Sequence, residues 1–224
     1  MDRQAALRQV RHVIERLVSD GSAVARSDGS AHSLFPVAIP PAEGAALRDR
    51  VVRESASRTI EVGLGYGLSA LYICEALVMN DAAGTRHVAI DPYQAGRFAN
   101  CGLQFLEEAG VIDLIEYHAE ESQTVLPQFL RDGRGFDLAF IDGNHRFDAV
   151  FVDLVYLGRL VRPGGLLVMD DYQLPAVARA ASFFAKNLAW TLEEVSPNDD
   201  LHQWAILRTS ALPDTRPFDY FIDF

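Results

Sequence analysis

The spacing of apolar positions divides the chain into a short N-terminal part and a longer part in which the pattern alternates. In the first eighteen residues, apolar side chains recur at helical spacing, which predicts an amphipathic helix whose apolar face is formed by Leu7, Val10, Ile14 and Leu17. Residues 21–41 are rich in Ser, Gly, Asp and Pro and predict a loop that carries the apolar run LFPVAIP. A second helix is expected over residues 42–54, with Pro41 suited to its first turn.

From Ser57 onward, short apolar runs rich in β-branched residues alternate with longer helical stretches. Strands are expected at 58–62, 87–90, 113–117, 136–141 and 165–170. Helices are expected near 67–79, 97–109, 122–131 and 146–161. Because these strands are apolar throughout rather than alternating, the pattern is typical of a doubly wound α/β fold, with a parallel sheet covered by helices on both faces.

Two further apolar runs, AWTLEEV at 189–195 and LHQWAILR at 201–208, are separated by too few residues to hold a helix. We therefore expect these two runs to form strands that pair antiparallel.

Composition restricts the class of protein. The chain has 224 residues, of which 49% are apolar and 23% charged, as in an ordinary globular domain. It shows no apolar stretch of membrane-spanning length and no apolar signal core, so we expect a cytoplasmic protein that neither spans nor binds a membrane. Two cysteines cannot form a disulfide framework, and a net charge of −11 argues against nucleic-acid binding. The apolar first helix and the Phe-rich ending suggest association with further copies of the chain.

In a doubly wound sheet, ligands bind where the strands end. The first of these strands is followed by GLGYG, in which Gly63, Gly65 and Gly67 allow a tight turn and a close approach to a ligand at a helix N-terminus. Glycines that only close a turn would give the same pattern. The GxGxG spacing also differs from the GxGxxG motif of dinucleotide-binding proteins. The second strand ends in Asp91, thirty positions after Glu61, where a carboxylate can accept hydrogen bonds from both hydroxyls of a ribose. An aspartate that starts a turn before a proline is the plain alternative.

Three aspartates follow two adjacent strands: Asp142 comes after the fourth, and Asp170 and Asp171 after the fifth. Because clustered carboxylates repel one another, and Mg²⁺ prefers oxygen ligands, a metal site is favoured over a solvated turn. Asp170 and Asp171 would point to opposite faces within a regular strand, unless the pleat ends there. An isolated loop histidine usually has no function, but beside such a metal His145 becomes the leading candidate for a general base. Ser122, after the third strand, could simply cap a helix.

Five segments together resemble the motifs of class I S-adenosylmethionine-dependent methyltransferases: EVGLGYGLS, VAIDPY, ESQTVLPQF, FIDGNH and VMDDY. Within that class, the chain is similar to metal-dependent O-methyltransferases of the catechol O-methyltransferase and macrocin-type sugar O-methyltransferase kind, over roughly residues 40–208. The resemblance implies a Rossmann-like sheet of seven strands with the last strand antiparallel. It assigns residues 41–224 to the methyltransferase domain and leaves residues 1–40 as an N-terminal appendage.

The resemblance also implies site residues. Those expected to bind S-adenosylmethionine, from its methionine end through the ribose to the adenine, are Glu61, Gly63, Gly65, Ser69, Asp91, Ser122 and Gln123, together with Asp142. Asp142, Asp170 and Asp171 would hold Mg²⁺ or another divalent cation. Catechol-type enzymes carry a lysine where this chain has His145 and an asparagine where it has Asp171. In both positions the chain is more similar to the antibiotic-sugar enzymes.

The expected reaction is methyl transfer to a hydroxyl of a small molecule, a sugar or a catechol-like phenol whose neighbouring hydroxyls can chelate the cation, with His145 as the base. A nicotinamide-dependent oxidoreductase would share the sheet and Asp91, but the glycine spacing and the three aspartates count against it. A non-catalytic cofactor-binding module would not require polar residues at successive strand ends. Candidate specificity elements are the LFPVAIP loop, the 196–202 connection, Tyr172 and the aromatic tail.

Overall fold

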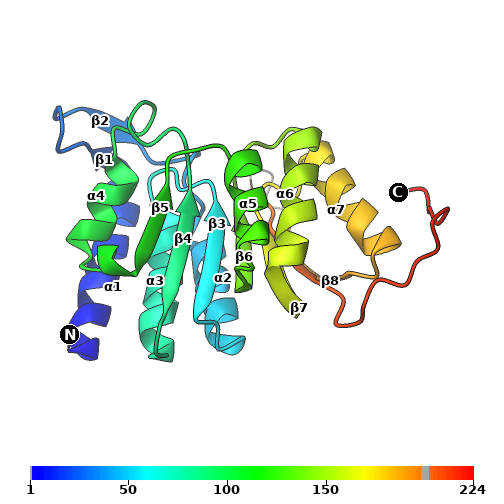
Figure 1. Cartoon of the computed structure of the whole chain (residues 1–224). Coiled ribbons are helices and arrows are strands. Elements are labelled where there is room, and N and C mark those ends of the chain that lie inside the picture. The colour runs from blue at the N-terminus through cyan, green and yellow to red at the C-terminus, as the bar shows by residue number, and fades with distance from the viewer. Residues whose placement is uncertain (1, 198–201) are drawn as a thin grey trace. The chain divides into compact units, whose positions relative to one another are not determined.

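The computed structural model describes residues 2–197 and 202–224 (Figure 1). The chain divides into two compact units between Glu121 and Ser122. The N-terminal unit consists of α1 (Arg3–Asp20), β1 (Ser22–Val24), β2 (Ala31–Ser33), α2 (Pro41–Arg53), β3 (Arg58–Val62), α3 (Leu68–Asn80), β4 (Arg86–Ile90), α4 (Cys101–Glu108), the 3-10 helix η1 (Ile112–Leu114) and β5 (Ile115–His118). The C-terminal unit consists of α5 (Ser122–Arg131), β6 (Phe136–Ile141), α6 (Phe147–Leu160), β7 (Val161–Met169), α7 (Pro175–Asn187), β8 (Thr191–Val195) and β9 (Ala205–Arg208).

The strands of the N-terminal unit are parallel and in register at their carboxyl ends. Val62 of β3 lies opposite Ile90 of β4, which in turn lies opposite His118 of β5. The Gly63 N–H donates to the carbonyl of Ile90 (2.9 Å), so the pairing continues one residue beyond β3. The residues that follow β3 and β4 therefore leave the sheet at the same level.

Helices α1 and α2 of the N-terminal unit pack against α3. The carboxylate of Glu75 on α3 is only 2% exposed and lies 2.6 Å from the Arg11 guanidinium of α1 and 3.7 Å from that of Arg48 on α2. A buried charge of this kind requires partners, and here the partners come from two different helices. Glu75 thus links the three helices electrostatically.

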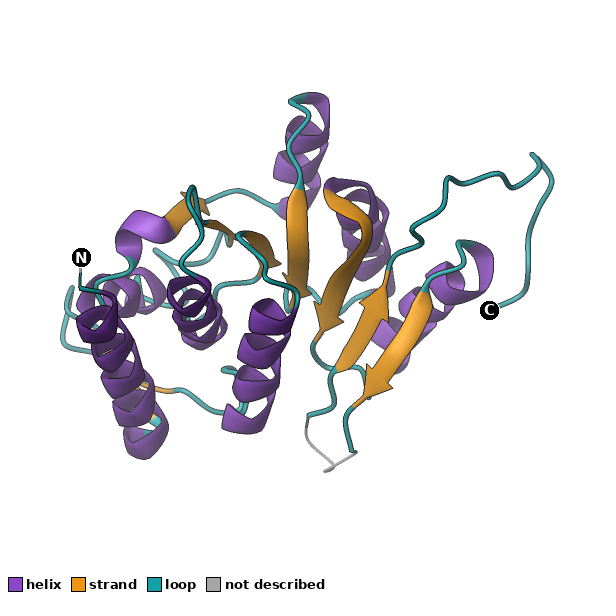
Figure 2. Cartoon of the chain, turned by 90° about the horizontal axis from the view of Figure 1, so that it is seen from below, coloured by secondary structure: helices purple, strands orange, loops and turns teal. Residues whose placement is uncertain are grey.

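In the C-terminal unit, β6 and β7 are parallel, whereas β9 runs antiparallel to both β7 and β8 (Figure 2). Ile141 of β6 lies opposite Met169 of β7, and Met169 lies opposite Ala205 of β9. The end of β7 therefore lies beside the start of β9.

The described residues form a seven-stranded sheet with the order β5-β4-β3-β6-β7-β9-β8, which confirms the Rossmann-like α/β class with an antiparallel last strand. The strands expected at 58–62 and 136–141 match the observed bounds, and the expected antiparallel pair is β8 with β9. No helix in the described part of the chain is both long and apolar enough to cross a membrane.

Several expected elements were wrong in detail. Residues 21–41 are not all loop, because β1 and β2 pair antiparallel. Helix α4 begins at Cys101 rather than near residue 97, since Ala99 and Asn100 both have positive φ (48° and 57°). Strand β5 begins at Ile115 rather than Asp113, because Ile112–Leu114 form the 3-10 helix η1.

Helix α7 was not expected. Its buried residues Val177, Ala180, Ala181 and Phe184 have helical spacing, so the periodic signal was present in the sequence. Residues 198–201, within the connection considered as a specificity element, lie outside the described residues.

Candidate functional site

The glycine segment after β3 is a turn that only glycines adopt readily. Gly63, Gly65 and Gly67 have φ values of 94°, 53° and 80°, in the left-handed region. A Cβ at Gly67 would lie 2.9 Å from the carbonyl oxygen of Gly102, so the turn packs closely against α4. A Cβ at Gly65 would meet no atom within 4 Å, which leaves open space beside the backbone at the carboxyl end of β3. This space lies just before the N-terminus of α3, where a ligand can approach backbone N–H groups.

The carboxylate of Asp91 binds this glycine segment. Its Oδ2 accepts hydrogen bonds from the backbone N–H groups of Leu64 (3.2 Å) and Gly65 (2.9 Å) and from the Gln94 side-chain amide (3.0 Å). The same amide donates to the Gly65 carbonyl (2.6 Å), so buried Gln94 holds both partners in place. Among the described residues, only the Tyr93 N–H donates to Asp91 Oδ1 (2.7 Å), which leaves that oxygen capacity for a further donor.

The carboxylate of Glu61 is held inside the same unit by two side chains. The Ser69 hydroxyl at the start of α3 donates to Glu61 Oε2 (2.7 Å). On the neighbouring strand, His87 Nε2 lies 3.2 Å from Glu61 Oε1, and His87 Nδ1 is hydrogen-bonded to the Thr59 hydroxyl (2.9 Å). Thr59 pairs with His87 in the β3–β4 register, so these side chains share one face of the sheet. Glu61 and Ser69 were expected here from the sequence, whereas His87 and Gln94 were not.

The two residues expected near the adenine, Ser122 and Gln123, begin helix α5 of the C-terminal unit. Gln123 is exposed and Ser122 is partly exposed. Both are therefore accessible at a helix N-terminus.

Asp142 and Asp170 follow adjacent parallel strands at the same level. The Asp170 N–H donates to the carbonyl of Ile141 (3.0 Å), which extends the β6–β7 pairing to the position of the two aspartates. Burial and the negative charge of Asp170 raise the pKa of the Asp142 carboxyl well above its ordinary value, against the lowering effect of His145. Two carboxylates so placed repel each other and would be stabilised by a cation.

Asp171 faces the same site as Asp170, although consecutive residues of a strand point to opposite faces. Its φ of 53° is left-handed and ends the strand pleat at this residue. The Gln173 side chain donates to Asp171 Oδ1 (2.7 Å) and accepts from the Gln203 N–H (2.8 Å), which fixes the carboxylate. Burial opposes ionisation of Asp171, but the hydrogen bond and charge of His145 and the hydrogen bond from Gln173 together outweigh it, and the pKa of Asp171 is lowered.

His145 lies between two of the aspartates. Its Nδ1 is 3.0 Å from Asp171 Oδ2, and its Nε2 is 3.4 Å from Asp142 Oδ1. Burial of the ring disfavours the protonated form, but the two carboxylates outweigh it and raise the pKa of His145 to about 10. In the cation-free protein at neutral pH, the imidazolium is therefore the positive charge that balances these carboxylates.

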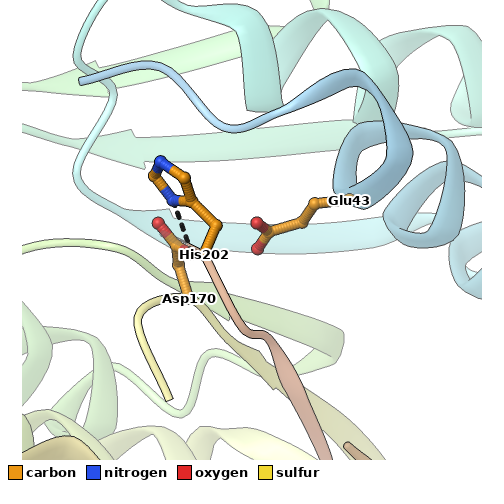
Figure 3. A group of neighbouring side chains, drawn as sticks. All are labelled: Glu43, Asp170 and His202. Atoms are coloured by element: carbon orange, nitrogen blue, oxygen red, sulfur yellow. Dashed lines mark ion pairs between the residues drawn. The ribbon is translucent and has the colours of Figure 1, made fainter. Parts of the chain in front are cut away.

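A second histidine completes the cluster. His202 Nδ1 lies 3.9 Å from Asp170 Oδ1 and 4.0 Å from Asp171 Oδ1. Figure 3 shows the imidazole of His202 beside the Asp170 carboxylate; the Glu43 side chain in the same view belongs to α2 of the N-terminal unit. His202 was not among the site residues expected from the sequence. The signal that could have found it is the antiparallel return of β9, which brings residues just before β9 beside those just after β7.

These residues fit a divalent cation. Asp142, Asp170 and Asp171 provide the carboxylate oxygens that hard divalent cations prefer. The imidazolium held by two carboxylates, and the part of the raised pKa of Asp142 that comes from the charge of Asp170 rather than from burial, both reflect negative charge gathered at this point. The three aspartates expected from the sequence thus lie in one cluster of the C-terminal unit with His145.

Comparison with known proteins places the chain among methyltransferases. Residues 60–172 match a family model described as a methyltransferase domain. A protein of Mycobacterium sp. (strain JLS) assigned to the O-methyltransferases is 29% identical over 191 residues, which cover 77% of this chain and 81% of that protein. A caffeoyl-CoA O-methyltransferase of Populus kitakamiensis is 30% identical over 141 residues and 62% of this chain. The matched region spans only 57% of the length of this plant relative.

The fold has solved relatives. The O-methyltransferase TomG from Streptomyces achromogenes, which is involved in tomaymycin synthesis and was solved in complex with S-adenosylmethionine, superposes with a TM-score of 0.65. The two chains are 22% identical, and the match covers 92% of this chain and 89% of TomG. At this identity the likeness establishes the fold.

Proposed function

Because the chain belongs to the methyltransferase domain family and, within it, to the S-adenosylmethionine-dependent O-methyltransferases, we propose that it methylates a hydroxyl of a small molecule with the help of a divalent cation. The membership confirms the resemblance to S-adenosylmethionine-dependent O-methyltransferases that the five sequence motifs carry. The cation, the base and the acceptor are the parts that the proposal adds.

The N-terminal unit supports the cofactor half of the proposal. S-adenosylmethionine, when bound, supplies the methyl group. Asp91 Oδ1 can accept a hydrogen bond from a ribose hydroxyl, since its other oxygen already binds the glycine segment. The open space at Gly65 and the N-terminus of α3 give the backbone access to the ligand. Glu61 is buried behind this turn and held by Ser69, and its negative charge would favour the positively charged methionine end.

The C-terminal unit supports the cation and the base. Asp142, Asp170 and Asp171 would hold the cation, which when bound lowers the pKa of the acceptor hydroxyl. His145 is oriented by Asp142 and Asp171 and would accept the hydroxyl proton. It can do so only when another positive charge balances these carboxylates, so the base role requires the cation site.

The acceptor class follows from chelation. A molecule with two neighbouring hydroxyls, a sugar or a catechol-like phenol, can bind the cation through both oxygens and so present one of them for transfer. His145 and Asp171 are the residues that make the chain similar to sugar methyltransferases, whereas the name of the plant relative points to a phenolic acceptor.

The observation that carries the proposal is the gathering of three carboxylates and His145 where β6 and β7 end. Calorimetric titration of the full chain with S-adenosylmethionine and S-adenosylhomocysteine, with and without MgCl₂, tests the cofactor. We expect both to bind, and methylation of a panel of sugar diols and catechols to stop on addition of a chelator. A folded protein that binds neither ligand would overturn the methyltransferase proposal, and turnover indifferent to chelator would overturn the cation.

A further inference from the structure

We propose that His202 is a direct ligand of the divalent cation and that the site therefore prefers a transition-metal ion such as Mn²⁺ or Co²⁺ to Mg²⁺. The inference rests on the proposed function, because it takes Asp170 and Asp171 as ligands of the same cation. It adds a nitrogen ligand to a set that the sequence motifs describe as oxygen only.

The His202 imidazole is set back from the carboxylates of Asp170 and Asp171 by more than a hydrogen-bond distance. His202 Nδ1 lies 3.9 Å from Asp170 Oδ1 and 4.0 Å from Asp171 Oδ1. Both distances exceed the ~2.7–3.2 Å of an N–H···O hydrogen bond. Two ligand atoms bound to one ion at about 2.0–2.2 Å each can be at most roughly 4.4 Å apart. Both distances lie within this limit, so one ion can bind the nitrogen together with a carboxylate oxygen of Asp170 or of Asp171.

His202 differs from His145 in its distance from the Asp171 carboxylate. His145 Nδ1 is only 3.0 Å from Asp171 Oδ2, which is a hydrogen-bond distance. The His145 imidazole is therefore in hydrogen-bonding contact with the Asp171 carboxylate. His202 Nδ1, in contrast, lies 4.0 Å from the other oxygen of that carboxylate, Asp171 Oδ1. The two histidines therefore occupy different places around Asp171, one as a proton carrier and one at ligand distance.

Backbone hydrogen bonds of the next residue fix the position of His202. The Tyr172 N–H donates to the carbonyl of Gln203 (2.6 Å), and the Gln203 N–H donates to Gln173 (2.8 Å). The Gln203 side chain donates in turn to the carbonyl of Ser196 (3.0 Å). These bonds attach the residue after His202 to the loop that carries Asp171. The imidazole is 14% exposed and its Nδ1 is buried, so the nitrogen faces the cluster rather than solvent.

The chemical consequence concerns metal selectivity. Mg²⁺ binds almost entirely through oxygen and loses its water reluctantly, whereas imidazole nitrogen is a good ligand for first-row transition metals. A site with three carboxylates and one imidazole should therefore bind Mn²⁺ more tightly than Mg²⁺, and the imidazole should account for much of the difference.

The test uses the full chain, freed of metal, with MnCl₂ and MgCl₂ as probes. Calorimetry measures the affinity for each ion, and pulsed EPR of bound Mn²⁺ detects the magnetic coupling of a directly bound imidazole nitrogen. The variants are His202→Gln and, as matched controls, His145→Gln in the same cluster and His12→Gln on the exposed side of α1. Thermal unfolding of each metal-free variant checks that it folds.

We expect wild type to show nitrogen coupling and to prefer Mn²⁺. His202→Gln should lose the coupling and about tenfold or more in Mn²⁺ affinity, with a smaller loss for Mg²⁺. Both controls should keep the coupling. Coupling that survives in His202→Gln, or that is lost only in His145→Gln, would overturn the assignment.

Failure of this inference is distinguishable from failure of the proposed function. If wild type binds Mn²⁺ without nitrogen coupling, His202 is not a ligand, but the cation proposal stands. If wild type binds neither ion yet still binds S-adenosylhomocysteine, both the inference and the cation proposal are wrong, and the methyltransferase assignment is untouched.

Discussion

Nε2 of His87 lies 3.2 Å from Oε1 of Glu61, and neither side chain has any exposed surface. The two residues come from adjacent strands, β4 and β3, and each has a second partner: Thr59 for the histidine and Ser69 for the glutamate. The chain of contacts therefore runs from inside the sheet to the first turn of α3. His87 is in this way a positioning residue for a carboxylate at the proposed cofactor site.

Replacing His87 by Leu should destabilise the fold by about 1–3 kcal/mol, because it removes the side-chain partner of the buried Thr59 and leaves Glu61 with Ser69 alone. Affinity for S-adenosylhomocysteine should fall as well, since Glu61 is then less well positioned. His87→Gln, which keeps a hydrogen-bonding group, should recover part of both losses. Urea unfolding and calorimetry measure the two effects, and wild-type values of both in His87→Leu would exclude the positioning role.

The ion pairs of the buried Glu75 should contribute more to stability than a more exposed ion pair between helices of the same unit. Glu75→Gln weakens its contacts with Arg11 and Arg48 and should cost about 1–3 kcal/mol in the free energy of unfolding. The matched control is Glu108→Gln, which removes the more exposed pair with Arg16 and should cost less than about 1 kcal/mol. Equal losses measured by chemical unfolding would contradict this ranking.

The cation-free protein should lose stability as the pH rises above neutral. The pKa of His145 is about 10 when folded and 6.5 when unfolded, so its stabilising contribution is complete below pH 6.5 and is lost as the pH passes through about 10. The raised pKa of Asp142 acts in the same direction, beginning at lower pH. Thermal midpoints measured with chelator between pH 6 and 10 should fall more steeply in wild type than in His145→Gln. A parallel pair of curves would show that His145 is not held by the carboxylates.

The amide of Gln173 should matter for the cation without affecting the cofactor. It donates to Asp171 and accepts from the backbone before β9, so Gln173→Ala should lower Mn²⁺ affinity by about tenfold. Affinity for S-adenosylhomocysteine should stay unchanged. Gln128→Ala, at an exposed position of α5, serves as the control in the same titrations. Unaltered cation binding in Gln173→Ala would show that Asp171 does not need this support.

His145→Ala should reduce turnover by roughly 10²–10⁴-fold and leave S-adenosylmethionine binding nearly intact. The expected loss reflects the missing proton acceptor rather than a lost ligand contact. Turnover is measured at saturating cofactor once an acceptor is known, and calorimetry reports binding. Turnover equal to that of wild type would remove His145 from its proposed role.

Much of the fold could be predicted because the strands are buried on both faces and are bounded by Gly, Pro and charged residues. Strands β3 and β6 were therefore predictable to the residue. The hairpin of β1 and β2 was not, because each strand has three residues and depends on tertiary contacts. The Gln104 side chain of α4 accepts from the Arg26 N–H (2.7 Å) and donates to the carbonyl of Val24 (3.0 Å). No local pattern records such contacts.

The sequence by itself determined which polar residues follow each strand. A buried parallel strand must end before a charged side chain can reach the site, so Asp91, Asp142 and Asp170 could be placed from the chain alone. Only the tertiary structure decided how those side chains are oriented and joined. The left-handed Asp171 brings consecutive aspartates to one site, and the return of β9 sets His202 beside them. Both depend on backbone conformation and strand register between distant segments, and neither is encoded in the spacing of residues along the chain.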